Sequence, residues 1–420
     1  MELKPGYKQT EVGVIPEDWE VRRLGELATI ATGNTPPTAD ATNYGDEFLF
    51  VSPGDLGEAK NVTSTDKRLS KKGFASARRF PKNSVLFVCI GSTIGKCGVA
   101  SVDLTSNQQI NAVFPGPLFS ADFLYYACCA AAPNVKSLAG EQAVPLVNKT
   151  QFSATTLALP LLAEQEAIAE ALSDADALIE SLDQLITKKR HLKQGAMQEL
   201  LTGKRRLPGF SGEWAVKSLG DLFTFSGGYS ASRDELSIDG HCYLHYGDIH
   251  GSSKTCIDAR VDYLDIPKLD VPLKSVSPNS LLKDGDVVFV DASEDDSGTS
   301  RHLVVVNRDN VPFISGLHTI VAKGKTNELG HAYRQYCFQT QAIHQQFLFF
   351  AVGTKVSGIS KTNIPKLTLP VPTLPEQTAI ATLLSDMDTE LAALESRLAK
   401  ARHIKQGMMQ ELLTGRIRLL

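Results

Sequence analysis

The amino-acid sequence predicts an α+β protein built as an internal repeat with a pseudo-two-fold axis. In this fold, two globular domains are each followed by a long helix, and the two helices pair as an antiparallel coiled coil. The first observation is a phrase, LKQGAMQELLTG at 192–203, that returns as IKQGMMQELLTG at 404–415 with ten of twelve positions identical. The second is a heptad spacing of apolar residues before both copies, which is typical of paired helices. The third is a set of short β-branched segments that echo one another between the halves.

Composition places the chain among ordinary globular proteins. It has 420 residues, of which 42% are hydrophobic and 21% charged, enough for two or more domains with their own cores. The sequence contains no apolar run of about 18 residues, and its first residues lack the apolar core of a signal peptide. The seven cysteines form no CxxC pair, which suits a reducing compartment. We therefore expect a cytoplasmic protein without a membrane segment.

The first globular domain is predicted at 1–158 and consists mainly of short strands. The candidate strands include WEVRRLGEL at 19–27, FLFVSPGDL at 48–56 and NSVLFV at 83–88, which are separated by Gly, Pro and Asn turns. Residues 67–82 contain seven basic and no acidic residues. Such a run is usually a solvated face, but it also offers an anionic partner a contact surface.

The first long helix is predicted at 159–203. Pro160 ends the preceding segment, acidic residues occupy the first turns, and basic residues occupy the last turns, as the helix dipole favours. About 39 residues at about 1.5 Å each give a rod of roughly 58 Å. The predicted coiled-coil seam consists of Ile168, Leu172, Ala175, Ile179, Leu182 and Ile186.

The second half repeats this plan with a domain at 204–368 and a helix at 369–420, which we expect to begin after Pro375. Echoes of the first half include WAVKSLGDL at 214–222, YLHYGDI at 243–249 and GDVVFV at 285–290. The segment from 213 to 328 holds 11 basic and 18 acidic residues, so it is net negative. The matching seam consists of Ile380, Leu384, Met387, Leu391, Leu394 and Leu398.

The repeat has geometric consequences. Because the second domain is inserted between the two helices, the end of one helix must lie near the start of the other, so the helices run antiparallel with the domains at opposite ends. The C-terminus should then approach the N-terminus. Gly195 and Gly407 lie inside the helices at a cost of about 1 kcal/mol each, which suggests a close approach of another backbone.

Motifs for catalysis or metal binding are weak. GSTIGKC at 91–97 is one residue short of a phosphate loop and has Cys97 at the Mg-binding position. NTPPT at 34–38 lacks the aromatic residue of an amino-methyltransferase motif. HCYLHYGDIH at 241–250 lacks a second cluster at zinc-ligand spacing, and no paired nucleophile and base stands out. The sequence therefore predicts a binding protein with no catalytic residue and no metal site.

With two unlike domains and two repeated helices, the chain resembles the specificity subunit of type I restriction-modification systems. The resemblance covers nearly the whole chain. Its most specific motifs are LPLLAEQEAIAEAL and LPEQTAIATLL, the KQGxMQELLTG endings, and RLPGFSGEW at 206–214, which opens the second half.

The resemblance implies that each globule is a target recognition domain that reads one half-site in double-stranded DNA. The paired helices would act as a ruler that fixes the gap between the half-sites. The subunit itself is expected to be non-catalytic and to bind no cofactor. It would recruit two methyltransferase subunits and two restriction subunits, which use S-adenosylmethionine, ATP and Mg. A rod of roughly 58 Å corresponds to about 17 base pairs at about 3.4 Å each, enough to bridge two half-sites.

The candidate DNA-contacting residues are basic, hydroxyl and histidine side chains from the basic run at 67–82 and from matching loops of the two domains, with Lys149 and Lys361 at equivalent positions as candidates for contacts with the DNA backbone. Arg and Lys bind phosphate or guanine, and Ser, Thr and His adapt to base edges. For the first domain they are Arg78, Arg79, Lys82, Ser92, Thr93, Lys96 and Lys149. For the second they are Ser293, Ser297, Thr299, Arg301, His302 and Lys361. For the acidic second domain, either basic side chains such as Lys254, Arg260, Arg301 and Lys355 gather on one face, or the methyltransferase subunits supply most phosphate contacts. We expect both to act together.

Three alternatives remain open at this stage. The subunit could serve a fused restriction-methylation enzyme, which would leave its recognition role unchanged. It could be a coiled-coil adaptor without a DNA role, which predicts no sequence-selective binding. It could be an enzyme with an unrecognised site, which predicts turnover by the isolated chain.

Overall fold

The computed structural model describes residues 5–419 except Glu58, Glu141, Gln142, Ser253, 294–299 and 352–356. The chain forms two compact units. Unit 1 consists of residues 1–184 and 396–420, and unit 2 consists of residues 185–395. Each unit therefore contains one globule and a segment of both long helices, so unit 1 is not a continuous stretch of sequence.

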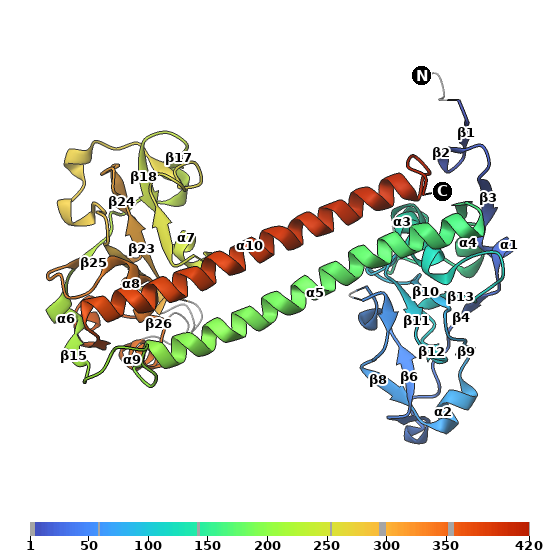
Figure 1. Cartoon of the computed structure of the whole chain (residues 1–420), viewed down its shortest axis with the longest axis horizontal. Coiled ribbons are helices and arrows are strands. Elements are labelled where there is room, and N and C mark those ends of the chain that lie inside the picture. The colour runs from blue at the N-terminus through green and yellow to red at the C-terminus, as the bar shows by residue number, and fades with distance from the viewer. Residues whose placement is uncertain are drawn as a thin grey trace. The chain divides into compact units, whose positions relative to one another are not determined.

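Unit 1 contains two five-stranded sheets that pack face to face (Figure 1). The first has the order β4 (Ile30–Thr32), β13 (Ile110–Val113), β10 (Val85–Val88), β11 (Cys97–Ala100) and β7 (Asn61–Val62). The second has the order β5 (Tyr44–Gly45), β8 (Lys67–Leu69), β6 (Phe48–Val51), β12 (Leu104–Ser106) and β9 (Arg79–Phe80).

The central strand β10 is buried on both faces, which explains why its sequence VLFV is continuously apolar. Val85 and Phe87 belong to a core shared with helix α3 (Ala121–Ser137), whereas Leu86 and Val88 belong to the core between the two sheets. The alternation follows from the period of two in a strand. The first sheet is therefore the middle layer of unit 1.

Smaller elements complete unit 1. A hairpin, one further strand pair and three short helices surround the sheets. They are β1 (Tyr7–Thr10) with β2 (Gly13–Pro16), β3 (Glu20–Arg23) with β14 (Thr156–Leu159), α1 (Leu24–Leu27), α2 (Lys71–Ser76) and α4 (Lys149–Ser153). The echo WEVRRLGEL thus forms a strand and then a one-turn helix, whereas the sequence predicted a strand for this segment. Lys149 begins the helix α4.

Unit 2 repeats the two-sheet plan. Its first sheet has the order β16 (Phe223–Gly227), β25 (Thr319–Gly324), β21 (Val287–Val290), β23 (His302–Val306) and β19 (Cys256–Asp258). Its second sheet has the order β17 (Leu236–Ser237), β20 (Lys268–Leu269), β18 (His241–Leu244) and β24 (Phe313–Ser315). The middle strand β21 alternates in the same way as β10: Val287 and Phe289 face one core, and Val288 and Val290 face the other.

The remaining elements of unit 2 differ in detail from those of unit 1. Two helices, α8 (His331–Cys337) and α9 (Gln341–Phe350), stand where unit 1 has the single helix α3. The others are β15 (Ala215–Ser218) with β27 (Thr368–Val371), β22 (Ala292–Ser293) with β26 (Ser357–Gly358), α6 (Leu219–Leu222) and α7 (Tyr246–His250).

Two long helices connect to these globules, α5 (Leu162–Leu200) and α10 (Leu374–Leu412), each of 39 residues. Pro375 lies in the first turn of α10 rather than before it, where its missing N–H costs no intrahelical hydrogen bond. Ion pairs show that the two helices run antiparallel, because residue numbers rise on one helix as they fall on the other. In unit 1, Asp176 pairs with Lys405 and Asp183 with Arg402; in unit 2, Lys189 pairs with Glu390 and Lys193 with Asp388.

The structure divides the predicted seam into two environments. Four of its residues lie in the globular cores, namely Ile168 and Leu172 in unit 1 and Ile380 and Leu384 in unit 2. The others lie farther along the helices: Leu182, Ile186 and Leu398 are buried, and Ala175, Ile179, Met387, Leu391 and Leu394 are half-buried, with Met387 still packed against the core of unit 2. The first turns of each helix therefore pack on a globule, and the later turns follow the partner helix.

A buried glutamate fastens the start of α5 in unit 1. Glu164 accepts a hydrogen bond from the Trp19 indole N–H at 3.0 Å and two from the Arg418 guanidinium at 2.5 and 2.8 Å. Arg418 also donates to Asp18, and these two carboxylates raise the pKa of the guanidinium. Tyr7 Oη donates to the carbonyl of Gly415 at 2.9 Å. The C-terminal tail thus packs against the N-terminal residues, which confirms that the chain ends approach each other.

The same set of Glu, Trp and Arg recurs in unit 2, and we call each set a clasp. Glu376 accepts from the Trp214 indole at 3.0 Å and from Arg206 at 2.5 and 2.6 Å. The glutamines that follow are also equivalent: Gln165 donates to the Pro160 carbonyl and Gln377 to the Pro372 carbonyl, both at 2.9 Å. These contacts account for the repeated Glu-Gln pair and for the arginines that follow each KQGxMQELLTG phrase.

Candidate nucleic-acid interface

Loops of unit 1 gather at one end of its first sheet. Strand β4 ends there at Thr32, β10 ends at Val88 and β13 begins at Ile110, because the register pairs Val88 with Ile110 and Asn111 with Thr32. We call the loops 33–38, 89–96, 107–109 and 143–149 the unit 1 loop surface. These loops contain no acidic residue and two lysines.

Backbone contacts hold these loops together. Cys89 N donates to the Gln109 carbonyl at 2.8 Å, and Gly91 N donates to the Pro145 carbonyl at 2.9 Å. A Cβ at Gly33 would collide with the Asn107 carbonyl, so these two loops touch backbone to backbone. Gly91 has a φ of 96°, a value that glycine adopts without strain. The loop surface is therefore fixed by the fold.

Four of the predicted residues lie on this surface. Ser92 and Lys149 are exposed, and Thr93 and Lys96 are half-buried. The aliphatic stem of Lys96 lies close to Gly57. Lys149 is the first residue of α4, where the loop 143–149 ends.

The predicted basic cluster is split by the fold. Arg78 lies beside the loop surface: its guanidinium donates to the Thr32 carbonyl at 2.7 Å, and its backbone N donates to Asn34 Oδ1 at 2.6 Å. Arg79 follows it and stacks on the Phe74 ring at 4.9 Å. Lys82 precedes β10, whereas Ser92 follows it, so the two residues lie at opposite ends of this strand. The structure therefore does not bring Lys82 together with Ser92.

The loop surface also contains three polar residues that the sequence reasoning missed. Thr35 Oγ1 donates to Gln108 Oε1 at 2.8 Å, and Asn34 holds Arg78 in place as described above. Thr35 and Gln108 are exposed. The signal that could have found them is the polar phrase NQQ between two β-branched segments, together with NTPPT, which was interpreted only as an incomplete methyltransferase motif.

The equivalent loops of unit 2 follow β16 and β21 and precede β25. The described part includes Arg301, which is exposed and donates to the His250 carbonyl. Ser293 lies in β22, paired with β26, and its side chain is outside the described residues. Ser297 and Thr299 also lie outside them. Lys361 is exposed and approaches Gly227 at the end of β16, so it lies beside these loops.

His302 is buried rather than exposed on a loop. It is 8% exposed and contacts the rings of Phe289 and Phe338 in the core beneath α8. Burial lowers its pKa to about 4, so the imidazole is neutral at pH 7. The register places it where unit 1 has Cys97, since Phe289 pairs with His302 as Phe87 pairs with Cys97. As placed, this side chain does not reach a DNA surface.

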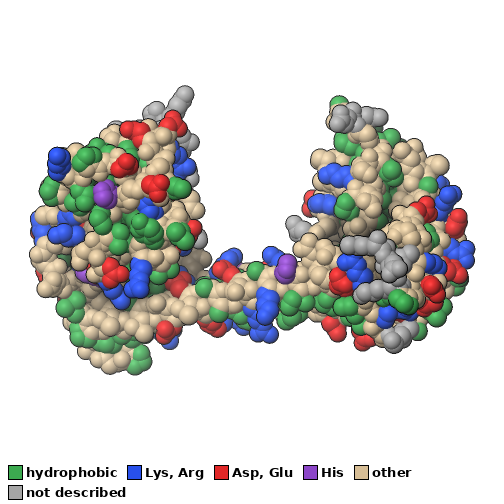
Figure 2. Space-filling model, turned by 90° about the horizontal axis from the view of Figure 1, so that it is seen from above, with side chains coloured by type: hydrophobic (Ala, Val, Ile, Leu, Met, Phe, Trp, Pro, Cys, Tyr) green, Lys and Arg blue, Asp and Glu red, His purple; other side chains and the backbone are tan. Residues whose placement is uncertain are grey.

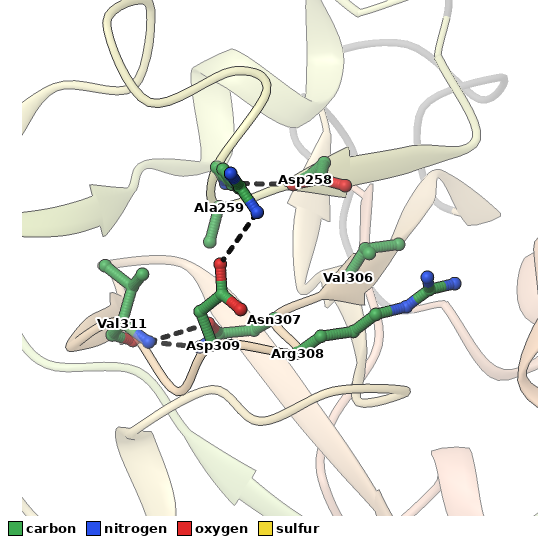
Figure 3. A pocket seen from close by; sticks show the side chains of 8 residues that line it. Asp258, Ala259, Val306, Asn307, Arg308, Asp309 and Val311 are labelled. Atoms are coloured by element: carbon green, nitrogen blue, oxygen red, sulfur yellow. Dashed lines mark hydrogen bonds and ion pairs between the residues drawn. The ribbon is translucent and has the colours of Figure 1, made fainter.

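The fold brings together only some of the basic residues expected on one face of unit 2. Lys254 pairs with Asp262 at 2.5 Å. Arg260 pairs with Asp309 at 3.6 Å in a shallow pocket of about 150 Å³ (Figure 3). This pocket lies beyond the end of β23, opposite Arg301. Figure 2 shows Lys and Arg side chains mixed with Asp and Glu on the face in view of each unit. Lys254 and Arg301 line one pocket, Arg260 lies at the opposite end of β23, and Lys355 lies outside the described residues.

The part of the chain that the structure describes contains neither a cluster of metal-binding side chains nor a membrane-spanning helix. Within it, no group of three or more His, Cys, Asp or Glu side chains could hold a metal ion. None of its helices is long and apolar enough to cross a membrane.

Comparisons with known proteins identify the family. The family model for the type I restriction modification DNA specificity domain matches residues 16–188 and 211–401. The MjaIX specificity subunit of Methanocaldococcus jannaschii is 22% identical, with 98% of this chain and 96% of the relative covered. The MjaVIII specificity subunit of the same organism is 23% identical, with 96% and 94% covered.

Solved structures agree at the level of the fold. The S subunit of a type I restriction-modification system from M. genitalium has a TM-score of 0.58 at 16% identity, with 98% of each chain covered. A chain from work on assembly and conformational transition of the type I R-M system has a TM-score of 0.56 at 15% identity, with 96% and 99% covered. With two matched specificity domains and two 39-residue helices, this chain belongs to the specificity subunits of type I restriction-modification systems.

Proposed function

We propose that the unit 1 and unit 2 loops each read one half-site of a split, asymmetric DNA target, and that α5 and α10 fix the gap between the half-sites. The observation that carries the proposal is a repeated frame with unlike loops. The clasp residues are the same in both units, Glu, Trp and Arg, whereas most residues of the loops at the sheet ends differ. A frame that stays constant while its loops vary is the arrangement expected of a reader of two different sequences.

The exposed face of the repeated phrase supports a second part of the proposal, the docking of partner subunits. Contacts within each unit account for Lys193, Lys405 and the buried leucines of this phrase. Other identical residues are exposed. They are Gln194 and Gln198 in α5, Gln406 and Gln410 in α10, and the histidine that precedes each phrase, His191 or His403. Gly195 and Gly407 lie beside them, and a Cβ at either would meet nothing within 4 Å. The close backbone approach predicted for these glycines therefore does not occur within the described chain.

Two matching faces suit two copies of one partner. We assign them to two methyltransferase subunits that bind S-adenosylmethionine, because an exposed helix glycine lets another helix approach closely. Two restriction subunits that use ATP and Mg would complete the assembly. The chain itself would bind none of these cofactors. The second candidate is that the chain directs a fused restriction-methylation enzyme to its target, since such a partner could bind the same faces.

The docking proposal is tested by Gly195→Leu and Gly407→Leu. Each adds an exposed side chain and should stabilise the helix by roughly 0.5–1 kcal/mol, because Leu is the better helix former. We expect each variant to lose one methyltransferase subunit in native mass spectrometry. Glu170→Leu is the matched control, since Glu170 is exposed on α5 and its counterpart in α10 is Thr382, so this position is not part of the repeated phrase. Full binding by both glycine variants would refute the assignment.

The recognition proposal is tested by mapping N6-methyladenine. The chain would be co-expressed with its methyltransferase subunit in a host that lacks adenine methylation. We expect a motif of two unlike half-sites around a fixed gap, and exchange of residues 33–148 for those of another family member should change one half only. A well-formed complex that methylates no defined motif would favour an adaptor without a DNA role.

A further inference from the structure

Gln108 is the exposed centre of a turn whose neighbours are fixed by internal hydrogen bonds. Asn107 Nδ2 donates to Gln109 Oε1, and Gln109 N donates to Asn107 Oδ1, both at 3.0 Å. Gln109 Nε2 also donates to the Ile90 carbonyl at 3.4 Å. The amides on either side therefore hold the turn, and Gln108 between them is exposed.

The backbone beneath Gln108 is anchored at both ends. Asn107 N donates to the Val51 carbonyl, and Gly33 N donates to the Ile110 carbonyl, both at 3.0 Å. Gly33 packs so closely on Asn107 that no Cβ fits between them. A side chain that reads a DNA base needs an anchored backbone of this kind, because ordering a flexible turn on binding costs affinity.

Thr35 fixes the orientation of the Gln108 amide. Its hydroxyl donates to Gln108 Oε1 at 2.8 Å, which uses one of the two lone pairs of that oxygen. Among the described residues, no hydrogen bond engages Gln108 Nε2. The amide therefore offers one acceptor site and two donors side by side.

This pattern matches one base edge. In the major groove, adenine presents the N6 amino group as donor beside N7 as acceptor, and a glutamine amide binds both at once. The surroundings suit DNA: the loop surface has no acidic residue, Lys96 and Lys149 lie on it, and Arg78 is held beside it. We propose that Gln108, oriented by Thr35, reads an adenine in the half-site bound by unit 1. This inference rests on the proposed function and names the residue that makes the contact.

Unit 2 lacks this device. The register aligns Ile110 with Thr319, because Val88 pairs with Ile110 as Val290 pairs with Thr319, so Gln108 corresponds to Leu317. Leu317 is half-buried, and its backbone N donates to Tyr243 Oη at 2.9 Å. An apolar side chain cannot replace a bidentate amide. The effect of changing Gln108 is therefore confined to one half-site.

The test uses the full chain in complex with its methyltransferase subunit and compares wild type, Gln108→Ala, Thr35→Val and Gln9→Ala. Gln9 is an exposed glutamine on β1 and serves as the matched control. Competition binding would be measured with duplexes substituted at each position of both half-sites. For Gln108→Ala we expect discrimination at one A·T pair of the first half-site to fall by about ten- to a hundredfold, with the second half-site unchanged. Thr35→Val should give a smaller loss at the same pair.

Replacing the adenine by 7-deazaadenine, which lacks the N7 acceptor, separates this contact from a general loss of binding. The replacement should weaken binding by wild type and by Gln9→Ala but leave Gln108→Ala unaffected. A wild-type complex without a split motif overturns the proposed function and this inference with it. If the wild-type complex has a split motif and Gln108→Ala reads the first half-site in the same way as wild type, the inference alone is overturned. Unchanged discrimination at the other base pairs of the first half-site shows that unit 1 of the variant is folded.

Discussion

Glu164 stabilises unit 1 through three hydrogen bonds that no solvent can replace. Its side chain is fully buried, as is Trp19, and it accepts from the Trp19 indole and twice from Arg418. Glu164→Ala would leave the indole N–H unsatisfied, which costs about 1–3 kcal/mol, and would remove charged hydrogen bonds worth about 1.5–3 kcal/mol. Arg418 is 32% exposed and keeps Asp18 as a partner, so the second contribution falls at its lower end. The expected loss is about 3 kcal/mol in the free energy of unfolding of unit 1.

For a unit of roughly 200 residues this corresponds to a Tm lower by about 6–12 °C. Hydrogen exchange followed by mass spectrometry assigns the change to one unit, because peptides of unit 1 should lose protection while those of unit 2 keep theirs. Glu376→Ala should produce the reverse pattern. Glu166→Ala is the control, since Glu166 is exposed two residues away on the same helix. A loss below about 1 kcal/mol, or equal loss of protection in both units, would refute the reasoning.

Two further changes test other parts of the structure. His302 has a pKa of about 4 in the folded protein, below its ordinary value of 6.5. Between these two pH values the unfolded chain therefore binds more protons than the folded chain. The free energy of unfolding of unit 2 should fall by up to about 3 kcal/mol as the pH drops from about 6.5 to 4. His302→Cys should remove this part of the pH dependence, as urea unfolding at pH 5 and 7.5 would reveal, and an identical pH profile would contradict it. Gly33→Ala forces a Cβ against the Asn107 carbonyl and should lower the free energy of unfolding of unit 1 by about 1–3 kcal/mol. It should also abolish recognition of the first half-site only, as measured by the duplex competition described above. Unaltered recognition would show that the loops do not need this contact.

The repeat and the helices were predictable because their signals are local and periodic. Heptad spacing predicted the helices α5 and α10, and the paired echoes placed β10 and β21. The seam was less informative, since Leu172 and Leu182 share one stripe although the first packs on a globule and the second follows the partner helix. Periodicity identifies a buried face but not the element that buries it.

The loop surface was less predictable because it depends on strand register. Lys82 and Ser92 lie close in sequence but at opposite ends of β10, so proximity along the chain was misleading. His302 follows a polar loop, yet it begins the inward face of β23. Gln108 is placed by contacts with residues far away in the sequence, such as Thr35. No spacing rule within one segment reveals contacts of this range.

Each clasp joins the segment that follows one long helix to the start of the other long helix. Arg206 follows the first helix but binds Glu376 at the start of the second, whereas Arg418 follows the second helix but binds Glu164 at the start of the first. A chain cut after residue 210 would therefore keep Glu164 and Arg206 but lose Arg418 and Glu376, the residues that bind them. Two copies of such a half-chain would restore both clasps by exchanging their arginines.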